Sequence, residues 1–237
     1  MNTILFQIPV SVDSLGLDLL ANNEPSEKTL SIIELITSGG IGGQIIMSTL
    51  GLLSILTVYL FVERFQMLKK AMKEDPHFMN KVKDYLSDNK VDSVLTLCER
   101  TASPVANLIA KGTTSKEGSN KDIQDAMERQ GNLEVYKLEH NLASLATIAG
   151  AAPMIGFLGT VIGMILAFHE MASAGGQIDV EMLSKGIYTA MTTTVAGLIV
   201  GIVAFLAYNN LVVKVTQATF KMEEATAEFI DVIAKTK

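Results

Sequence analysis

The sequence predicts an all-α membrane protein in which three transmembrane helices continue into a helical bundle on one side of the membrane. Three stretches, residues 35–62, 140–169 and 186–213, contain no Asp, Glu, Lys or Arg. Each exceeds the roughly 20 apolar residues that a helix needs to cross a hydrocarbon core about 30 Å thick. Because lipid offers the backbone no hydrogen-bond partners, we expect these stretches to cross as helices.

The charge pattern divides the chain into seven segments. We expect an external N-terminal segment at 1–36, transmembrane helices at 37–63, 140–170 and 185–210, a cytoplasmic helical domain at 64–139, an external loop at 171–184 and a cytoplasmic helical tail at 211–237. The N-terminal segment is not typical of a signal peptide, since Asp13 and Asp18 interrupt its apolar residues. A single cysteine, Cys98, excludes an internal disulfide and is expected to be a buried thiol.

Basic residues predict the orientation. Of the 19 Lys and Arg residues, 13 lie between Arg64 and Lys137 and four follow the third crossing. The positive-inside rule assigns these regions to the cytoplasm, so the N-terminus is outside and the C-terminus inside. The strongest cytoplasmic anchor follows the first crossing and consists of Arg64, Lys69, Lys70 and Lys73. The partner surface is a lipid bilayer, and a net charge of −6 argues against nucleic acid.

Helical periodicity continues through the cytoplasmic insert. Short helices are expected at 91–100 and 104–111, followed by a polar loop at 113–120. Ser119 and Asp122 resemble a capping box that opens the next helix. No proline occurs between Asn120 and Pro153, which predicts one unbroken helix from 120 to 170, roughly 75 Å long. Its charged residues, and those of the C-terminal tail, are expected to form a solvated face.

Small and hydroxylated residues gather on one side of the second and third crossings when these are placed on a helical wheel. In the second crossing the small face comprises Ala149, Ala152, Pro153, Gly156, Gly159, Thr160, Gly163 and Ala167. In the third it comprises Gly186, Ala190, Thr193, Thr194, Gly197, Gly201, Ala204 and Tyr208.

Two interpretations fit these faces. The Gly159/Gly163 and Gly197/Gly201 spacings are typical of close helix packing in membranes, and threonine hydroxyls can bond the carbonyls of their own helix. The alternative is a polar pathway, because hydroxyls cluster at Thr160 on one helix and at 189 and 192–194 on the other. Three helices cannot enclose a pathway alone, so a symmetric oligomer would have to turn the small faces inward.

None of the three uncharged stretches, 35–62, 140–169 and 186–213, places a carboxylate or a lysine within the membrane. A proton relay through the bilayer normally needs an ionisable side chain, and a threonine hydroxyl cannot hold a proton at neutral pH. If protons are handled, the titrating group must therefore come from another polypeptide.

The two small-faced crossings resemble the second and third membrane helices of the ExbB/TolQ/MotA proton-channel family. In the second, the family core is matched at Leu145, Ala146, Thr147, Ile148, Ala152, Pro153, Gly156, Gly159, Thr160, Val161, Gly163 and Met164. Residues 186–209 match the pattern of the third. MotA-type stators have a fourth crossing that this chain lacks, so the resemblance is nearer to ExbB and TolQ.

The resemblance implies a homopentamer in a bacterial inner membrane, around helices of an ExbD/TolR-type partner whose Asp titrates. It also implies proton-driven motion delivered to a TonB-like periplasm-spanning protein, with no cofactor and no enzymatic activity. By this resemblance Thr160 and Thr194 match the family's pore-facing threonines. Thr147 matches a hydroxyl position lower on the helix of Thr160, and Pro153 matches the position of a helix irregularity. Thr189 stands where many relatives have Glu, so a water held by Thr189, Thr193 and Thr194 is one alternative to the partner's carboxylate alone.

Other functions compete with this one. A TolQ-like envelope role or a gliding or secretion motor would share the same membrane core. A passive membrane scaffold would use only the glycine faces. A membrane enzyme has little support: His169 and Glu170 are adjacent, but Ser173 stands where a second His of a metal motif would be.

Overall fold

The computed structural model describes residues 40–72, 76–116, 118–173 and 180–236. The described residues form helices joined by turns and contain no strand. The helices are α3 (Gly40–Ala71), α4 (Phe78–Ser87), α5 (Val91–Thr101), α6 (Pro104–Thr114), α7 (Asn120–Glu139), α8 (Leu142–Ser173) and α9 (Val180–Thr236). The expected N-terminal segment and the centre of the expected external loop lie outside the described residues.

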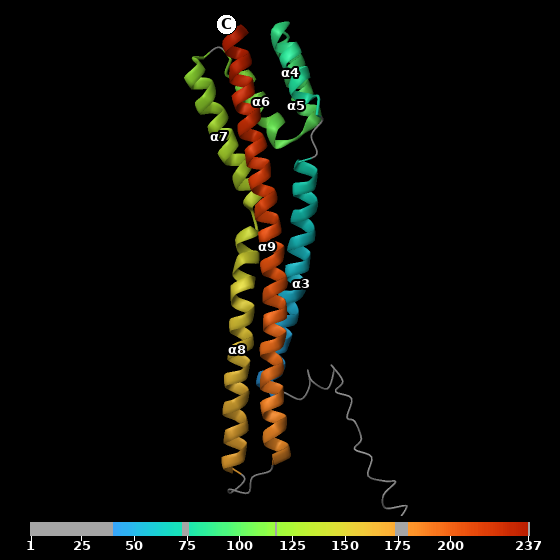
Figure 1. The fold of residues 1–237 in the computed structure, drawn as a ribbon, viewed down its shortest axis with the longest axis vertical. Helices are drawn as coiled ribbons and strands as arrows, with labels where there is room; N and C mark the ends of the chain where they lie inside the picture. The colour runs from blue at the N-terminus through green and yellow to red at the C-terminus, as the bar shows by residue number, and fades with distance from the viewer. Residues whose placement is uncertain (1–39, 73–75, 117, 174–179, 237) are drawn as a thin grey trace, which may run out of the picture.

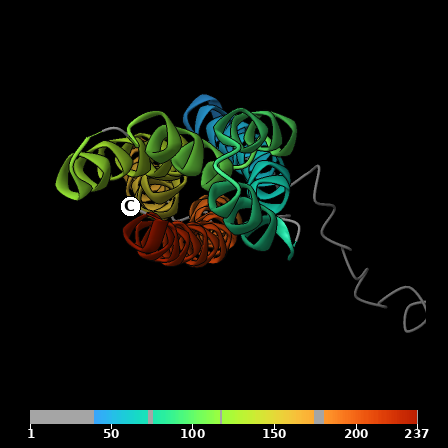
Figure 2. The same cartoon turned by 90° about the horizontal axis from the view of Figure 1, so that it is seen from above.

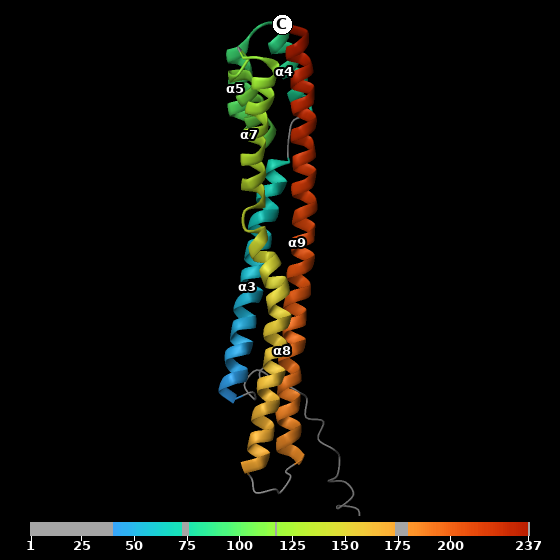
Figure 3. The ribbon, with the colours of Figure 1, turned by 90° about the vertical axis from the view of Figure 1, so that its left-hand side faces the viewer.

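The molecule is a tall, narrow bundle organised around α9 (Figure 1). This helix has 57 residues and is therefore about 85 Å long at 1.5 Å per residue. Figure 3 shows α8 and α7 following one another alongside α9, with α3 beside the α8 half. Seen along the long axis, α9 lies on one side of the molecule, next to α7 and α8 (Figure 2).

Among the described residues three helical spans, 42–71, 120–173 and 186–235, are long and apolar enough to cross a membrane, and each overlaps one of the predicted crossings. Their outward surfaces carry exposed apolar side chains, including Ile55 on α3, Met154 and Phe157 on α8, and Leu206 on α9. Such surfaces suit lipid or other membrane helices rather than water. The chain is thus an all-helical, multi-pass membrane protein.

The remaining helices continue the same hydrophobic core into the charged end of the bundle. Phe78 from α4, Cys98 from α5, Ile109 from α6, Met127 from α7 and Phe229 from α9 are all buried there. Local signals set the helix starts: Ser103 caps α6, whose first residue is Pro104, and the predicted capping box between Ser119 and Asp122 is confirmed at the start of α7.

The predicted unbroken helix from 120 to 170 is wrong. α7 ends at Glu139 and α8 begins at Leu142, because Asn141 adopts the left-handed conformation with φ of 66°. Asparagine is one of the few residues that tolerate this conformation, which ends a helix without a proline. The membrane helix α8 and the helix α7 are therefore separate elements.

Candidate functional site

The candidate site is the contact between α8 and α9, where the two small faces meet inside one chain. A Cβ atom built at Gly156 would lie 2.8 Å from the carbonyl oxygen of Thr193 and 3.0 Å from the Cα of Gly197. A Cβ at Gly163 would lie 2.7 Å from that of Ala190. No side chain larger than hydrogen fits at these glycines, so the backbones approach closely.

The same close approach continues towards the start of α8. A Cβ built at Gly201 would lie 2.5 Å from Cγ of Pro153 and 3.1 Å from the carbonyl oxygen of Ala149. Pro153 lies inside α8 and has no amide hydrogen to donate to that carbonyl. Gly159 faces the Thr193 side chain and leaves no space for a methyl group. Because the two faces cover each other, these glycines do not line a space between chains.

Two hydroxyls of α9 cross the contact and donate to one carbonyl of α8. The Thr194 hydroxyl donates to the Gly156 carbonyl oxygen at 3.0 Å. The Thr193 hydroxyl lies 3.2 Å from the same oxygen and 2.7 Å from that of Ala190. Four residues after Gly156, Thr160 donates its hydroxyl to the Phe157 carbonyl at 2.6 Å.

The structure thus brings Thr160 and Thr194 together. In an α-helix the Gly156 carbonyl also accepts the amide of Thr160, so both residues adjoin one oxygen atom. Both are half-buried in the chain, at the margin of the contact rather than within it. Their hydroxyl hydrogens point to carbonyls, which leaves the oxygen lone pairs as acceptors.

The other predicted hydroxyls are placed differently from this pair. Thr193 is only 2% exposed, enclosed between α8 and α9. Thr189 is buried on the side of α9 that faces Gly43 of α3. Thr147 is exposed near the start of α8, where its hydroxyl donates to the Ala143 carbonyl; at 13 residues from Thr160 it is about 20 Å away along the helix axis. Thr147 and Thr189 therefore lie apart from Thr160, whereas Thr193 reaches the Gly156 carbonyl from inside the contact.

The predicted cytoplasmic anchor needs a correction at Arg64. This side chain is buried, with its guanidinium against the break between α7 and α8: Nη2 lies 2.6 Å from Nδ1 of His140, and Nη1 donates to Sδ of Met67 at 3.0 Å. Lys69 and Lys70 are exposed, as an anchor requires, while Lys73 lies outside the described residues. At the same level Lys214 of α9 covers the Phe65 ring, 4.9 Å from its centre.

A buried carboxylate on α7 escaped the sequence argument. Oε1 of Glu134 accepts hydrogen bonds from Asn107 of α6 at 3.1 Å, Gln130 at 3.0 Å and Lys137 at 2.8 Å. Glu134 was expected on a solvated face, yet it is only 5% exposed. Three donors, one of them charged, compensate for its burial and tie α6 to α7. The helical spacing of Gln130, Glu134 and Lys137 was the only available signal.

Within the described part of the chain, no group of three or more His, Cys, Asp or Glu side chains could hold a metal ion. The close contact between residues 153–163 of α8 and 190–201 of α9 offers carbonyl and hydroxyl oxygens but no titratable side chain. Fold and site together define a membrane helix bundle whose small-faced pair presents two threonines at its edge.

Comparisons with known proteins identify the family. The family model of the MotA/TolQ/ExbB proton channel family matches residues 100–224, which include α7, α8 and most of α9. The match covers more than half of the chain, and the chain belongs to this family. Its members form a proton-channel family rather than an enzyme family.

Relatives named for two systems resemble the chain. It is 29% identical over 214 residues to the Tol-Pal system protein TolQ of Haemophilus influenzae, covering 85% of this chain and 91% of the relative. It is 39% identical over 83 residues to the biopolymer transport protein ExbB of Helicobacter pylori, covering 35% and 54%. For the ExbB of Aquifex aeolicus the identity is 35% over 92 residues, covering 39% and 62%.

Proposed function

We propose that the chain is the channel subunit of an inner-membrane, proton-driven motor and works with an ExbD/TolR-type partner that supplies the titrating Asp. The proposal rests on two observations taken together, the uncharged crossings and the position of two threonines. The three stretches 35–62, 140–169 and 186–213 contain no Asp, Glu, Lys or Arg, while the hydroxyls of Thr160 and Thr194 donate to the carbonyls of Phe157 and Gly156, one residue apart, on the margin of a close-packed helix pair. Such a chain can guide a proton but cannot carry one.

The geometry of the hydroxyls favours a neutral acid. With their hydrogens directed to the Phe157 and Gly156 carbonyls, Thr160 and Thr194 present oxygen lone pairs that can accept a hydrogen bond. A protonated carboxylic acid donates to such an oxygen, whereas a carboxylate would need donors. Burial also penalises the carboxylate. The partner's Asp would therefore pass these threonines in its protonated form.

The energies involved are compatible with movement. Each elementary charge that crosses 100 mV releases about 2.3 kcal/mol. A hydrogen bond between membrane helices contributes about 0.6 kcal/mol on average. The free energy that one proton releases thus exceeds the free energy of one hydrogen bond between a threonine and the partner. The partner can therefore leave one threonine and reach the next subunit.

A ring of copies would supply the enclosure that one chain lacks. The exposed apolar residues of α3, α8 and α9 leave ample surface for neighbouring copies and lipid, and we propose the family's pentamer. The exposed Lys69 and Lys70 and the charged α4–α7 end support the orientation with the N-terminus outside and the C-terminus in the cytoplasm. We keep the seven segments predicted from the sequence as part of this proposal.

Two destinations for the work are open to such a motor. The ExbB-named relatives favour TonB-dependent import across the outer membrane. The alignment with TolQ spans most of both chains and favours an envelope-integrity role as the second candidate. The neighbouring genes separate the two, since each system would encode its own periplasmic protein.

The test is to replace each threonine with valine, which keeps the shape and removes the hydroxyl. Thr160→Val and Thr194→Val should abolish proton-driven uptake or envelope function and leave the native mass of the purified complex unchanged. Thr49→Val is the matched control, because the Thr49 hydroxyl on α3 also donates to its own helix, at 2.9 Å from the Ile45 carbonyl. Normal function in both site variants at normal expression would contradict the proposal.

A further inference from the structure

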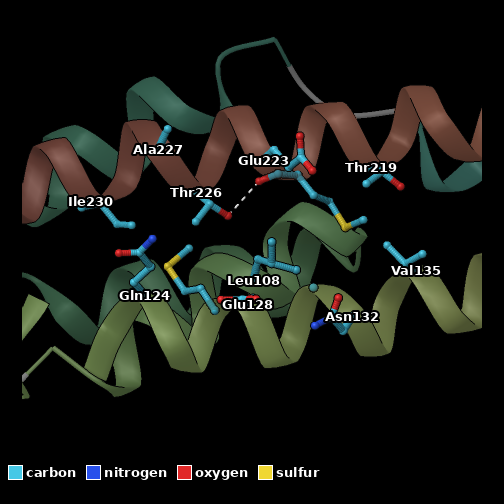
Figure 4. Close-up of a pocket in the computed structure, with 13 residues that line it drawn as sticks. Leu108, Gln124, Glu128, Asn132, Val135, Thr219, Glu223, Thr226, Ala227 and Ile230 are labelled. Atoms are coloured by element: carbon cyan, nitrogen blue, oxygen red, sulfur yellow. Dashed lines mark hydrogen bonds between the residues drawn. The ribbon is translucent and has the colours of Figure 1, made fainter. Parts of the chain in front are cut away.

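A groove opens between α7 and α9 on the cytoplasmic half of the bundle. Its volume is about 460 Å³, and its walls are residues of these two helices with Leu108 of α6 between them. Figure 4 shows Gln124, Asn132 and Val135 of α7 facing Thr226, Ile230 and Thr219 of α9 across it. The groove is remote from the hydroxyl site in the membrane.

The floor of the groove is apolar and adaptable. Leu108, Met127 and Met222 line it and are buried, and methionine fits partners of varied shape because its side chain is flexible. Gly131 widens the groove: a Cβ there would meet only Leu108 Cδ2, at 3.9 Å. A glycine inside a helix costs about 1 kcal/mol relative to alanine, so α7 sacrifices stability where the groove is open.

The rim of the groove is acidic. Glu128 of α7 and Glu223 of α9 both line it and are exposed, and neither has an ion pair within the described ranges. No Lys or Arg lines the groove. By contrast, Glu134 and Glu228 on the same two helices are paired with Lys137 and Lys83. The groove therefore combines an apolar floor with two uncompensated carboxylates.

We propose that this groove binds a short peptide segment that carries Lys or Arg beside apolar residues, namely the cytoplasmic flank of the partner's single membrane helix. This inference rests on the proposed function, which requires such a partner. The positive-inside rule gives that flank basic residues. From Asn210, at the predicted end of the third crossing, to Thr219 in the groove is about 14 Å along α9, which five extended residues can span.

Binding is tested with a designed probe. A fluorescein-labelled peptide of twelve residues with lysine and leucine at helical spacing is titrated against the full-length protein in a neutral detergent. We expect saturable binding by fluorescence anisotropy, and no binding of the same peptide with glutamate in place of lysine. Equal binding of the two peptides would overturn the proposal.

Paired variants connect the binding to the groove. Glu128→Gln with Glu223→Gln should weaken binding roughly fivefold, because two exposed ion pairs contribute about 0.5 kcal/mol each. The control pair Glu99→Gln with Glu224→Gln changes the net charge equally, lies outside the groove and should leave affinity unchanged. Gly131→Leu should abolish binding by filling the groove, while Gly131→Ala should retain it. Equal losses in the two charge pairs, or unimpaired binding to Gly131→Leu, would overturn the proposal.

The identity of the occupant is tested in native membranes. A photo-crosslinking residue at Asn132, which lines the groove, should capture a small single-helix protein through residues on the cytoplasmic side of its membrane helix. Capture of a second copy of this chain would overturn the proposal. Failure of the proposed function would show in a different experiment. If that function is wrong, Thr160→Val retains proton-driven activity, regardless of whether the peptide binds the groove.

Discussion

Replacing Gly156 with alanine tests whether the close contact between α8 and α9 is the structural basis of the site. The added methyl carbon would lie 2.8 Å from the Thr193 carbonyl oxygen and 3.0 Å from the Cα of Gly197. Both are backbone atoms, so no rotamer change can relieve the contact and the helices must separate. Separation also lengthens the bonds from Thr193 and Thr194 to the Gly156 carbonyl.

The size of the effect follows from three contributions. Overpacking costs about 2 kcal/mol, the two weakened hydroxyl bonds cost about 1 kcal/mol together, and alanine returns about 1 kcal/mol of helix propensity. The net loss is about 2 kcal/mol in the free energy of unfolding, or roughly 30-fold in the folding equilibrium. Gly150→Ala is the matched control on the same helix, since a Cβ there meets nothing within 4 Å.

The assay is unfolding of the purified protein in mixed micelles by increasing sodium dodecyl sulfate, followed by far-ultraviolet circular dichroism. We expect Gly156→Ala to unfold at a lower detergent fraction than the wild type, and Gly150→Ala at the same or a higher fraction. Coincident unfolding of the two variants would refute the view that the glycine face sets the spacing of α8 and α9.

Two further predictions concern the charged end of the bundle. Arg64→Met should speed backbone hydrogen exchange at residues 141–145 by roughly tenfold, because a hydrogen bond to a charged group contributes about 1.5 kcal/mol and Arg64 contacts His140 at the helix break. Lys69→Met changes an exposed site and should leave the exchange rate unchanged. Equal exchange rates in the two variants would contradict a role for Arg64 at the break. Burial and then the nearby Glu99 raise the pKa of the Cys98 thiol from 9.0 to about 11. The unfolded chain therefore loses this proton first, and the free energy of unfolding should fall by about 2 kcal/mol as pH rises from 9 to 11. Cys98→Ala should lack that decline in chemical denaturation, and an identical pH dependence in both proteins would contradict the assignment.

The membrane spans were predictable because they depend on local composition. Uncharged stretches longer than a bilayer and a skewed distribution of Lys and Arg need no tertiary information. The capping box at Ser119 and Asp122 is likewise a signal within four residues. The break at Asn141 was missed because its support comes from α3: Arg64 is 76 residues away from His140 in sequence.

The small faces show the limit of a helical wheel. The wheel gives the residues that share a face, but not the surface that the face meets. Close packing and a polar pathway both remained open for Thr160, Thr193 and Thr194. In the structure Thr193 lies inside the contact and the other two lie at its margin, a difference that depends on how α9 is rotated against α8. Glu134 illustrates the same point, since its Asn107 partner comes from another helix.

The packing of α8 on α9 restricts where proton-driven movement can occur. Backbones are in close contact from Gly163 to Pro153 on α8 and from Ala190 to Gly201 on α9, and one added methyl group in that contact already costs about 2 kcal/mol. Parting the two helices along this length would need several times the 2.3 kcal/mol that one charge releases across 100 mV. Breaking a single hydrogen bond to a hydroxyl at the margin needs less than one third of that free energy. If the proposed function holds, the helix pair therefore moves as one unit, and the sliding surface is the edge that carries Thr160 and Thr194.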